Sequence, residues 1–569
     1  MKTNKFLLGT LAFLSMGVMA SCSNEDGPAI NDGAEQTGER YMAVRISSSA
    51  VSGTRADDLT QHPAGTTDYE VGTDKENAIS AQDIRFYFFT DKYEPFLLSA
   101  SNVNGDVTPT NVVKPISLSG DIHDGNYSSS LEGVLVLGKA ADQAYVGKVP
   151  SYVLCAANLS DSEFANLANK SLEDLYDEIV SMGNLQKFKM TSTTYLKKNE
   201  NRPDGAGWDR VICSKIEPSS VSDDPEVAKK NPVDIYIERQ VVKVRTKGIQ
   251  QWDAVKTQGS TSNEYEFVDA NNAKTTKNLV VKLTGWKLRN TANTARMFKN
   301  ISKSVNYFTG WNDETYHRSH WAITPSTLVP GNTSYDIYKS ETFNLGNYDS
   351  NNKDENVAYT YPNTTFSGYV GDNDFDAKEE HPLSMTDRTT GATAVVIRGE
   401  VGVEEDGEFK ALDIVRWAGS IYLTEDFQAL VAKEYDIEKK NDPGTTDASM
   451  VHFDTKTDAT QANKHVVTIV KTVNGTEDVD LFDRFNNVEH WIDGVTSYYV
   501  NIQHATNPDG EALYGVVRNH IYEHEITGVV GLGVPGNEPK NPEKEAESFV
   551  ACRLNVLNWG LVSRPIVLE

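Results

Sequence analysis

Short segments in which apolar and polar residues alternate recur along this chain and predict β-strands. In the first of them, residues 41–47, Met42, Val44 and Ile46 fall on one face, which is the pattern of a strand with one buried side. Further alternating or continuously apolar segments lie between clusters of Gly, Asn, Asp and Pro. They cover residues 84–89, 134–137, 151–158, 235–244, 279–283, 394–399 and 498–502. Short strands separated by turn residues indicate an all-β protein.

One helical interruption of this pattern is predicted. Ser171 and Asp174 have the spacing of a capping box, and apolar residues follow at helical spacing, so a helix is expected to begin here. Further along, residues 498–502 are expected to pair with 514–522 in a hairpin across the turn at 507–510. The absence of a fixed-period repeat in the sequence disfavours a solenoid or propeller. Two β-sandwiches fit the pattern best.

Two proline-rich, charged segments divide the chain, one at residues 217–232 and one at 535–548. The first is interpreted as an interdomain connection and the second as a spacer. A strand with one strongly apolar face follows the spacer. Its apolar positions are Val550, Cys552, Leu554 and Val556, followed by Trp559. Such a strand either folds back onto its own domain or fills a groove in another chain by β-strand addition.

The composition narrows the classes of protein that the chain can represent. Of its 569 residues, 38% are hydrophobic and 9% aromatic, which is enough to build the cores of a folded protein. The length fits two large domains or three small ones, since β-rich domains often reach about 200–250 residues. The net charge of −27 makes nucleic acid an unsuitable partner, because its phosphates would be repelled.

The N-terminal segment has the pattern of an export leader. Lys2 and Lys5 precede an apolar run over residues 6–20, which is shorter than the roughly 20 residues of a membrane span. Small residues then stand directly before Cys22, as in a bacterial lipobox, where the thiol receives a lipid and becomes the new N-terminus. The polar residues that follow suit a tether. An ordinary signal peptide with a chance cysteine is the alternative.

The remaining cysteines do not suggest a disulfide framework. If Cys22 is lipidated, Cys155, Cys213 and Cys552 are left, and an odd number cannot pair completely. Their spacing also does not suggest a zinc site. Small buried side chains are therefore their expected role.

No catalytic residue, cofactor or metal site is predicted. His520 and His524 lack the Glu of a zinc-protease motif and stand in a strand-like segment, so they are expected at the surface or an interface. His317 and His320 lie in a loop-like, aromatic segment, and no metal site is expected there. Residues 372–376 begin like a calcium loop but lack its glycine and its bidentate glutamate. Nothing in the sequence requires an enzyme.

Several of these segments together resemble the type V fimbrillins of Bacteroidota. The resemblance is carried by the lipobox at Cys22, the strand 41–47 with the following Arg55-Ala56 step, and residues 237–244, 285–290, 517–522 and 550–559. In their order, their spacing and the overall length, they are most similar to the stalk subunits of short (minor) fimbriae.

The resemblance implies two transthyretin-like Greek-key β-sandwich domains in tandem, with a few short helices. It also implies export as an outer-membrane lipoprotein and cleavage between Arg55 and Ala56, which removes the strand 41–47 and leaves a groove. The donor strand of a neighbouring subunit would fill this groove, with Val550, Cys552, Leu554, Val556 and Trp559 as donor residues. The implied parts are a signal peptide at 1–21, a propeptide at 22–55, sandwich domains at 56–233 and 234–534, and a linker with donor strands at 535–569.

The implied function is structural: a subunit of a cell-surface fimbria that polymerises and supports adhesion. Its expected partners are other copies of the chain, tip and anchor subunits, an Arg-specific trypsin-like surface protease, and host or bacterial surface ligands. No cofactor is expected. A tip or anchor subunit is one alternative. The other is a monomeric lipid-anchored glycan-binding protein or hydrolase, which the 8 Trp and 25 Tyr residues favour.

Overall fold

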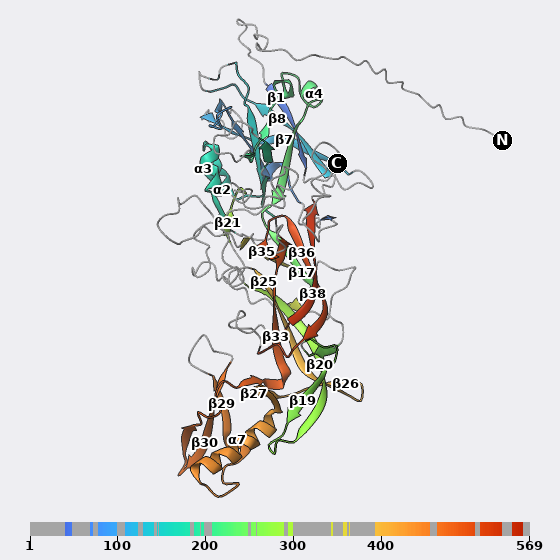
Figure 1. Cartoon of the computed structure of the whole chain (residues 1–569). Coiled ribbons are helices and arrows are strands. Elements are labelled where there is room, and N and C mark those ends of the chain that lie inside the picture. The colour runs from blue at the N-terminus through green and yellow to red at the C-terminus, as the bar shows by residue number, and fades with distance from the viewer. Residues whose placement is uncertain are drawn as a thin grey trace, which may run out of the picture. The chain divides into compact units, whose positions relative to one another are not determined.

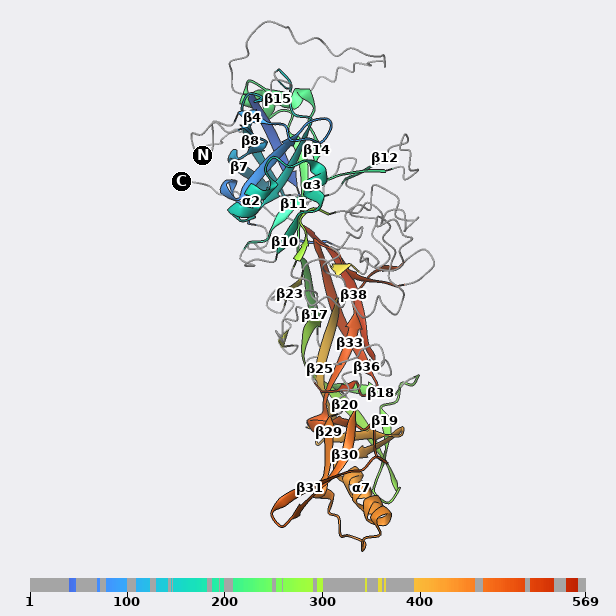
Figure 2. The ribbon, with the colours of Figure 1, turned by 90° about the vertical axis from the view of Figure 1, so that its left-hand side faces the viewer.

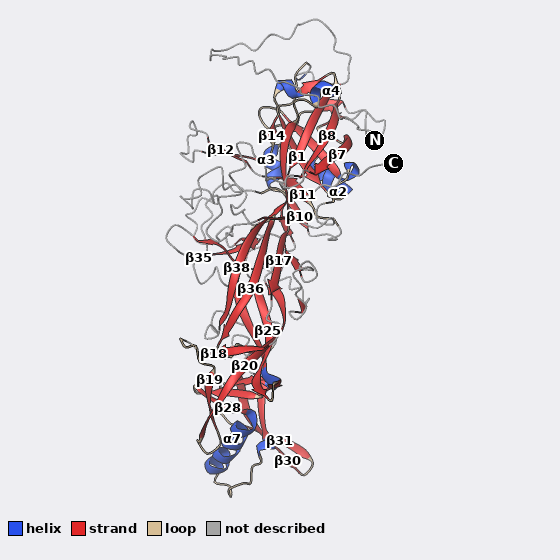
Figure 3. Ribbon diagram, turned by 90° about the vertical axis from the view of Figure 1, so that its right-hand side faces the viewer, coloured by secondary structure: helices blue, strands red, loops and turns tan. Residues whose placement is uncertain are grey.

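The computed structural model describes residues 40–47, 69–71, 78–99, 109–122, 129–141, 145, 147–181, 187–193, 195–198, 208–247, 252–257, 259–289, 294–299, 343–344, 357–360, 363–364, 393–455, 464–506, 512–536 and 549–560. Strands predominate in these residues and helices are few (Figure 3), as the sequence predicts for an all-β protein. Within the described part of the chain, no helix is long and apolar enough to cross a bilayer.

The first large sheet has ten strands. Figure 1 labels three of them, β1, β8 and β7. Eight of them follow the order β6-β3-β9-β11-β16-β1-β8-β7, while β14 joins β9 and β15 joins β1. These strands are β1 (Arg40–Ser47), β3 (Ile84–Phe89), β6 (Val112–Val113), β7 (Pro115–Ile122), β8 (Ser129–Leu137), β9 (Tyr152–Ala157), β11 (Met190–Ser192), β14 (Ser214–Lys215), β15 (Val221–Ser222) and β16 (Val233–Arg239). Two short pairs, β4 (Leu98–Ser99) with β5 (Pro109–Thr110) and β12 (Tyr195–Lys198) with β13 (Trp208–Val211), accompany it.

Two short helices contribute to the core of this first sheet. The helix α2 (Asp161–Leu167) begins with a capping box, in which the Ser160 side chain and the Glu163 carboxylate each accept the other residue's backbone N–H. The helix α3 (Leu172–Tyr176) begins at Ser171, as predicted. It ends at Tyr176, whereas the apolar spacing predicted that it would continue to about residue 180. Residues Ile179–Ser181 instead form strand β10, which pairs with β21 (Thr294–Arg296). A third short helix, α4, covers Pro225–Ala228.

The second large sheet has sixteen strands. They are β2 (Tyr69–Val71), β17 (Val242–Lys247), β18 (Trp252–Lys256), β19 (Glu264–Val268), β20 (Lys274–Arg289), β22 (Phe343–Asn344), β23 (Val357–Thr360), β25 (Ala394–Glu405), β26 (Glu408–Ala411), β27 (Ile414–Trp417), β28 (Ser420–Leu423), β32 (Glu489–Trp491), β33 (Val495–Asn501), β36 (His520–Val530), β37 (Val534–Pro535) and β38 (Phe549–Gly560). The fully buried Trp286, Ile397 and Tyr498 belong to its core, which is separate from that of the first sheet. The two cores correspond to two β-sandwiches.

A third hydrophobic cluster lies around the helix α7 (Thr424–Lys439), which packs against a small sheet of β29 (Val451–Thr455), β30 (His465–Val473) and β31 (Thr476–Leu481) (Figure 2). Phe427, Val431 and Tyr435 recur at helical spacing and are buried in this cluster. The helix ends where Lys440 adopts a left-handed conformation. This lobe was not expected from the sequence.

Two sequence expectations for strands differ from the structure. The segment 235–244 is not one strand, because β16 ends at Arg239 and β17 begins at Val242, and the two strands belong to different cores. The expected hairpin near residue 500 forms between β34 (Gln503–Thr506) and β35 (Ala512–Val516), with β24 (Asn363–Thr364) on the other edge of β35. Residues Val495–Asn501 instead pair with β25, whose apolar face completes the core.

Candidate functional site

The strand β1 lies between two neighbours along most of its length. It pairs antiparallel with β8 over eight positions, from Arg40 opposite Leu137 to Ser47 opposite Ser130. On its other edge it pairs parallel with β16 from Val44 to Ser47, and residues 41–42 pair with β15. The backbone of β1 is therefore hydrogen-bonded on both sides, as in a central strand.

The side chains of β1 follow the predicted alternation. Met42, Val44 and Ile46 are completely buried in the first core. Arg45 points to the opposite face, where its guanidinium lies 3.2 Å from the Glu132 carboxylate and 3.3 Å from that of Asp234. Arg45 thus bridges both neighbouring strands across the exposed face of β1.

Without β1, the first sheet would hold an open groove. Its walls would be β8 and β16, which carry unpaired backbone groups once β1 is gone. Its floor would expose buried apolar side chains. These include Leu131, Leu135 and Leu137 on β8 and Val233 and Ile235 on β16.

The terminal strand β38 pairs with its own chain. It lies beside β36 in an antiparallel ladder, from Phe549 opposite Val530 to Asn558 opposite His520, with a register shift between Ile526 and Gly528 (Figure 1). Residues 558–560 also pair parallel with β2. Of the two arrangements that the sequence left open for this strand, the structure has the one in which it folds back.

The expected donor residues can be located by their register. Val550, Cys552, Leu554 and Val556 stand opposite Val529, Ile526, His524 and Tyr522, and Trp559 stands opposite Glu70 of β2. Val529, Ile526 and Tyr522 belong to the second core. The terminal strand therefore runs along a core strand of the second sandwich.

The other expected sites fall into two groups. Cys22, Arg55 and Ala56 lie outside the described residues, as do His317, His320 and residues 372–376. Cys155 and Cys213 are free and buried, as expected, and burial raises the pKa of both thiols.

The histidines of β36 correct a sequence expectation. His520 and His524 are almost fully buried, not at the surface, and β36 is a central strand that pairs with β17 on one edge and β38 on the other. Burial lowers the pKa of His524 to about 4, opposed by the Arg245 backbone and the Glu523 carboxylate. In the described part of the chain, no three His, Cys, Asp or Glu side chains are grouped so that they could hold a metal ion.

A comparison of the chain with models of protein families gives a match in its C-terminal part. Residues 489–564 match the family described as "Major fimbrial subunit protein type IV, Fimbrillin, C-terminal". This region begins with β32 and contains both β36 and the terminal strand β38. A search of curated proteins finds no match.

Several solved structures of bacterial proteins are remotely similar to the chain. A cell adhesion protein from Parabacteroides distasonis is 10% identical with a TM-score of 0.35, and the alignment covers 92% of this chain and 98% of that chain. One from Bacteroides eggerthii is 10% identical with a TM-score of 0.34, covering 93% and 100%. The tip fimbrial protein Mfa3 from Porphyromonas gingivalis is 9% identical with a TM-score of 0.26, covering 92% and 100%. TM-scores this low do not establish a common fold.

The family match agrees with the sequence motifs, which include residues 517–522 and 550–559 of the matched region. Fimbrillins are structural subunits of surface fimbriae and not enzymes. The resemblance predicted from the motifs is thereby confirmed, since residues 489–564 of the chain match the C-terminal region of the fimbrillins, the subunits of surface fimbriae.

Proposed function

We propose that this fimbrillin is the shaft subunit of its fimbria and polymerises by protease-triggered donor-strand exchange. In this proposal a protease cuts between Arg55 and Ala56, β1 leaves the first sandwich, and the terminal strand of a neighbouring subunit takes its place. The observation that carries the proposal is the position of β1, which lies between β8 and β16 and has Met42, Val44 and Ile46 completely buried.

The energetics favour a stable replacement for β1. Each of its three buried side chains contributes roughly 1.5–3 kcal/mol through burial, and an empty groove would expose the apolar floor described above. The terminal strand offers Val550, Cys552, Leu554 and Val556 at the same period of two. A strand of this pattern would place apolar side chains in the groove at the same spacing as those of β1.

Donation would give the terminal strand hydrogen-bonding partners on both of its edges. On its own chain, β38 has one long neighbour, β36, and a short one, β2. In the groove it would lie between β8 and β16, so its backbone would have partners along both edges. A ladder of eight positions with β8 and a shorter one of four positions with β16 would then replace the ladder with β36.

The need for a protease follows from the same geometry. Before the cut, β1 is joined covalently to the domain that it completes, so that any competing strand faces a high effective concentration of β1. After the cut, β1 is held by non-covalent contacts alone. Once it is released, it diffuses away from the subunit and rarely binds again. Cleavage thus converts a closed precursor into a subunit that can accept a strand.

The remaining parts of the proposal concern the cell surface. Cys22 would carry the lipid that anchors the precursor to the outer membrane, and cleavage after Arg55 would release the subunit from it. The partners would be further copies of the chain, tip and anchor subunits, and an Arg-specific protease. Ligands on host or bacterial surfaces would be bound by the assembled fimbria.

The cleavage step is tested by the variant Arg55→Ala, with Arg45→Ala as its matched control. Arg45 lies within β1, whose backbone is paired on both edges, and a protease needs extended, unpaired backbone. We expect Arg55→Ala to accumulate as an uncut precursor without filaments, and Arg45→Ala to assemble. Mass spectrometry of the N-terminus and electron microscopy of sheared surface material report the two outcomes. Filaments whose subunits retain residues 22–55 would contradict the proposal.

One observation favours a second candidate, a tip or anchor subunit. The terminal strand is paired with β36 of its own chain, and a subunit at the end of a fimbria would have no need to donate it. Immunogold labelling of fimbriae separates the two candidates, because a shaft subunit is labelled along the whole filament and a tip or anchor subunit at one end.

A further inference from the structure

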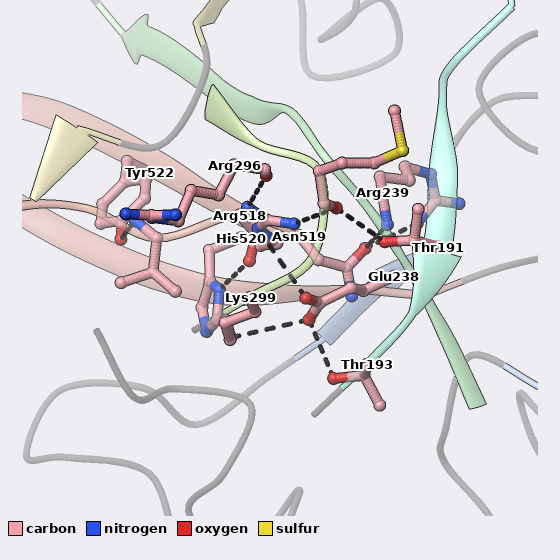
Figure 4. Close-up of polar contacts among 12 residues, drawn as sticks. Thr191, Thr193, Glu238, Arg239, Arg296, Lys299, Arg518, Asn519, His520 and Tyr522 are labelled. Carbon is pink, nitrogen blue, oxygen red and sulfur yellow. Dashed lines mark hydrogen bonds and ion pairs between the residues drawn. The ribbon is translucent and has the colours of Figure 1, made fainter. Parts of the chain in front are cut away.

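A buried group of polar side chains lies where the two sandwiches meet in the chain (Figure 4). It gathers the ends of β11 and β16, the segment 294–299 and the start of β36. We call it the polar joint. Its members are Thr191, Thr193, Glu238, Arg239, Gln240, Lys299, Arg518 and Asn519, each less than 10% exposed.

Glu238, at the end of β16, is the acidic centre of the polar joint. Its carboxylate accepts a hydrogen bond from the Thr193 hydroxyl at 3.1 Å. The Lys299 ammonium lies 3.6 Å and the Arg518 guanidinium 3.8 Å from it (Figure 4). Lys299 comes after β20 in the chain and Arg518 directly before β36, and both of these strands belong to the second sheet. One carboxylate of the first sandwich therefore attracts two cations from the second half of the chain.

A second set of contacts converges on two backbone carbonyls. The carbonyl oxygen of Met297 accepts hydrogen bonds from Thr191 at 3.2 Å, from Gln240 at 2.7 Å and from Arg518 at 3.1 Å. Arg518 also donates to the carbonyl of Arg296 at 2.7 Å. Hydrogen bonds from a charged guanidinium are stronger than those between neutral groups. Segment 294–299 is therefore fixed from both sides.

The segment 294–299 is part of the first sandwich in its packing, although it follows β20 of the second sheet. Its strand β21 pairs with β10, and the Met297 N–H donates to the Glu178 carbonyl at 2.7 Å. Ala295, Met297 and Phe298 are buried in the first core, where they are joined by Ile521 of β36. The second half of the chain thus supplies core residues to the first sandwich at two places.

Asn519 completes the polar joint from the other side. Its side-chain oxygen accepts from the Arg239 guanidinium at 3.1 Å and from the Arg239 backbone N–H at 3.3 Å. Its own backbone N–H donates to the Val241 carbonyl at 3.0 Å. The turn before β36 is in this way bonded to the short link between β16 and β17.

From these contacts we propose that the polar joint is a clasp that makes the two sandwiches unfold as one cooperative unit. Domains joined only by a linker unfold independently. Here, opening the joint would separate the charged side chains of Glu238, Lys299 and Arg518 from one another, although each is buried in the folded chain. It would also pull apolar side chains out of the first core. In a fimbria, the clasp would carry tension from one sandwich to the other. Only this last point rests on the proposed function.

The clasp is tested on the purified, unassembled full chain by calorimetry and by hydrogen exchange of residues 294–299 and 518–521. Glu238→Gln keeps the size of the side chain and removes its charge. Thr191→Val removes one of three donors to Met297 and serves as the milder variant if Glu238→Gln folds poorly. Glu405→Gln, which breaks the exposed ion pair with Lys410, is the matched control.

The wild-type chain is expected to melt in one transition, and Glu238→Gln in two. Exchange of both segments should rise about tenfold in Glu238→Gln and about threefold in Thr191→Val, because a local opening exposes the joint. Two separate transitions in the wild type, or unchanged exchange of both segments in the variants, would overturn the clasp. Because no filament is involved, a failure of the proposed assembly would leave this result unaffected.

Discussion

Val44 is the residue whose role changes most across the proposed cleavage. In the precursor it is fully buried between β8 and β16, so Val44→Ala should destabilise the full chain by about 2 kcal/mol. Arg45→Ala, on the exposed face, should have little effect, since surface ion pairs contribute little. Urea titration of the purified precursor measures both. Subunits taken from filaments should not differ in stability, because cleavage has removed position 44; a difference there would contradict the removal of β1.

His524 makes the stability of the second sandwich depend on pH. Its pKa in the folded chain is about 4, below the roughly 6.5 of an exposed histidine. As the pH falls from 6.5 towards 4, the unfolded chain binds a proton that the folded chain does not. The contribution of His524 to stability is therefore largest above pH 6.5 and falls by about 1.4 kcal/mol per pH unit as the pH drops from 6.5 towards 4.

The variant His524→Leu is expected to lose this part of the pH dependence. Urea titrations at about pH 7 and pH 5 compare the two chains before most carboxylates titrate. Between these values the wild type should lose about 2 kcal/mol more than the variant. His490, whose pKa burial also lowers to about 4, is present in both chains and cancels in the comparison. An equal loss in both chains would mean that His524 binds a proton freely in the folded state.

At the scale of single elements, the strand β38 is predicted to stabilise its own chain before assembly. Deleting residues 549–569 would leave one edge of β36 without its ladder of hydrogen bonds, so the melting temperature should fall and binding of a hydrophobic dye should increase. Deleting only 561–569, beyond β38, is the control and should change neither. The longer deletion should also prevent filament formation. Normal filaments from that chain would show that the terminal strand is not the donor.

The strands were predictable from the sequence where one face is buried and the other exposed. Residues 41–47 are an example, because Met42, Val44 and Ile46 are buried while Arg45 lies on the exposed face. The capping residue Ser171 was also found, because its hydroxyl accepts the Asp174 N–H within one helical turn. Patterns of this kind depend on neighbours in the sequence, and so the sequence contains them.

Features that depend on distant parts of the chain were not predictable in this way. The break between β16 and β17 arises because the two strands enter different cores, and the residues 235–244 alone read as one continuous strand. No sequence pattern indicated a role for Glu238, because its cationic partners Lys299 and Arg518 are far away in the sequence. The helix α7 could have been found from the spacing of Phe427, Val431 and Tyr435, which is helical.

At the scale of the whole molecule, the charge of the subunit should affect how fast it assembles. Subunits with a net charge of −27 repel one another, and salt screens this repulsion beyond about 8 Å at physiological ionic strength. We expect the rate of polymerisation of cleaved subunits to rise with salt, whereas the number of subunits per filament length should not change. Light scattering at several salt concentrations measures the rate. A rate that falls with salt would indicate that attraction between charged patches, and not repulsion, controls the encounter.

The identity of the strand between β8 and β16 in the assembled filament tests the central claim most directly. A cryo-electron microscopy reconstruction of native fimbriae at side-chain resolution would identify it. The account predicts residues 549–560 of the neighbouring subunit in this position, with no residue before Ala56 present and with β36 no longer paired to the β38 of its own chain. A filament in which residues 40–47 still lie between β8 and β16 would contradict it.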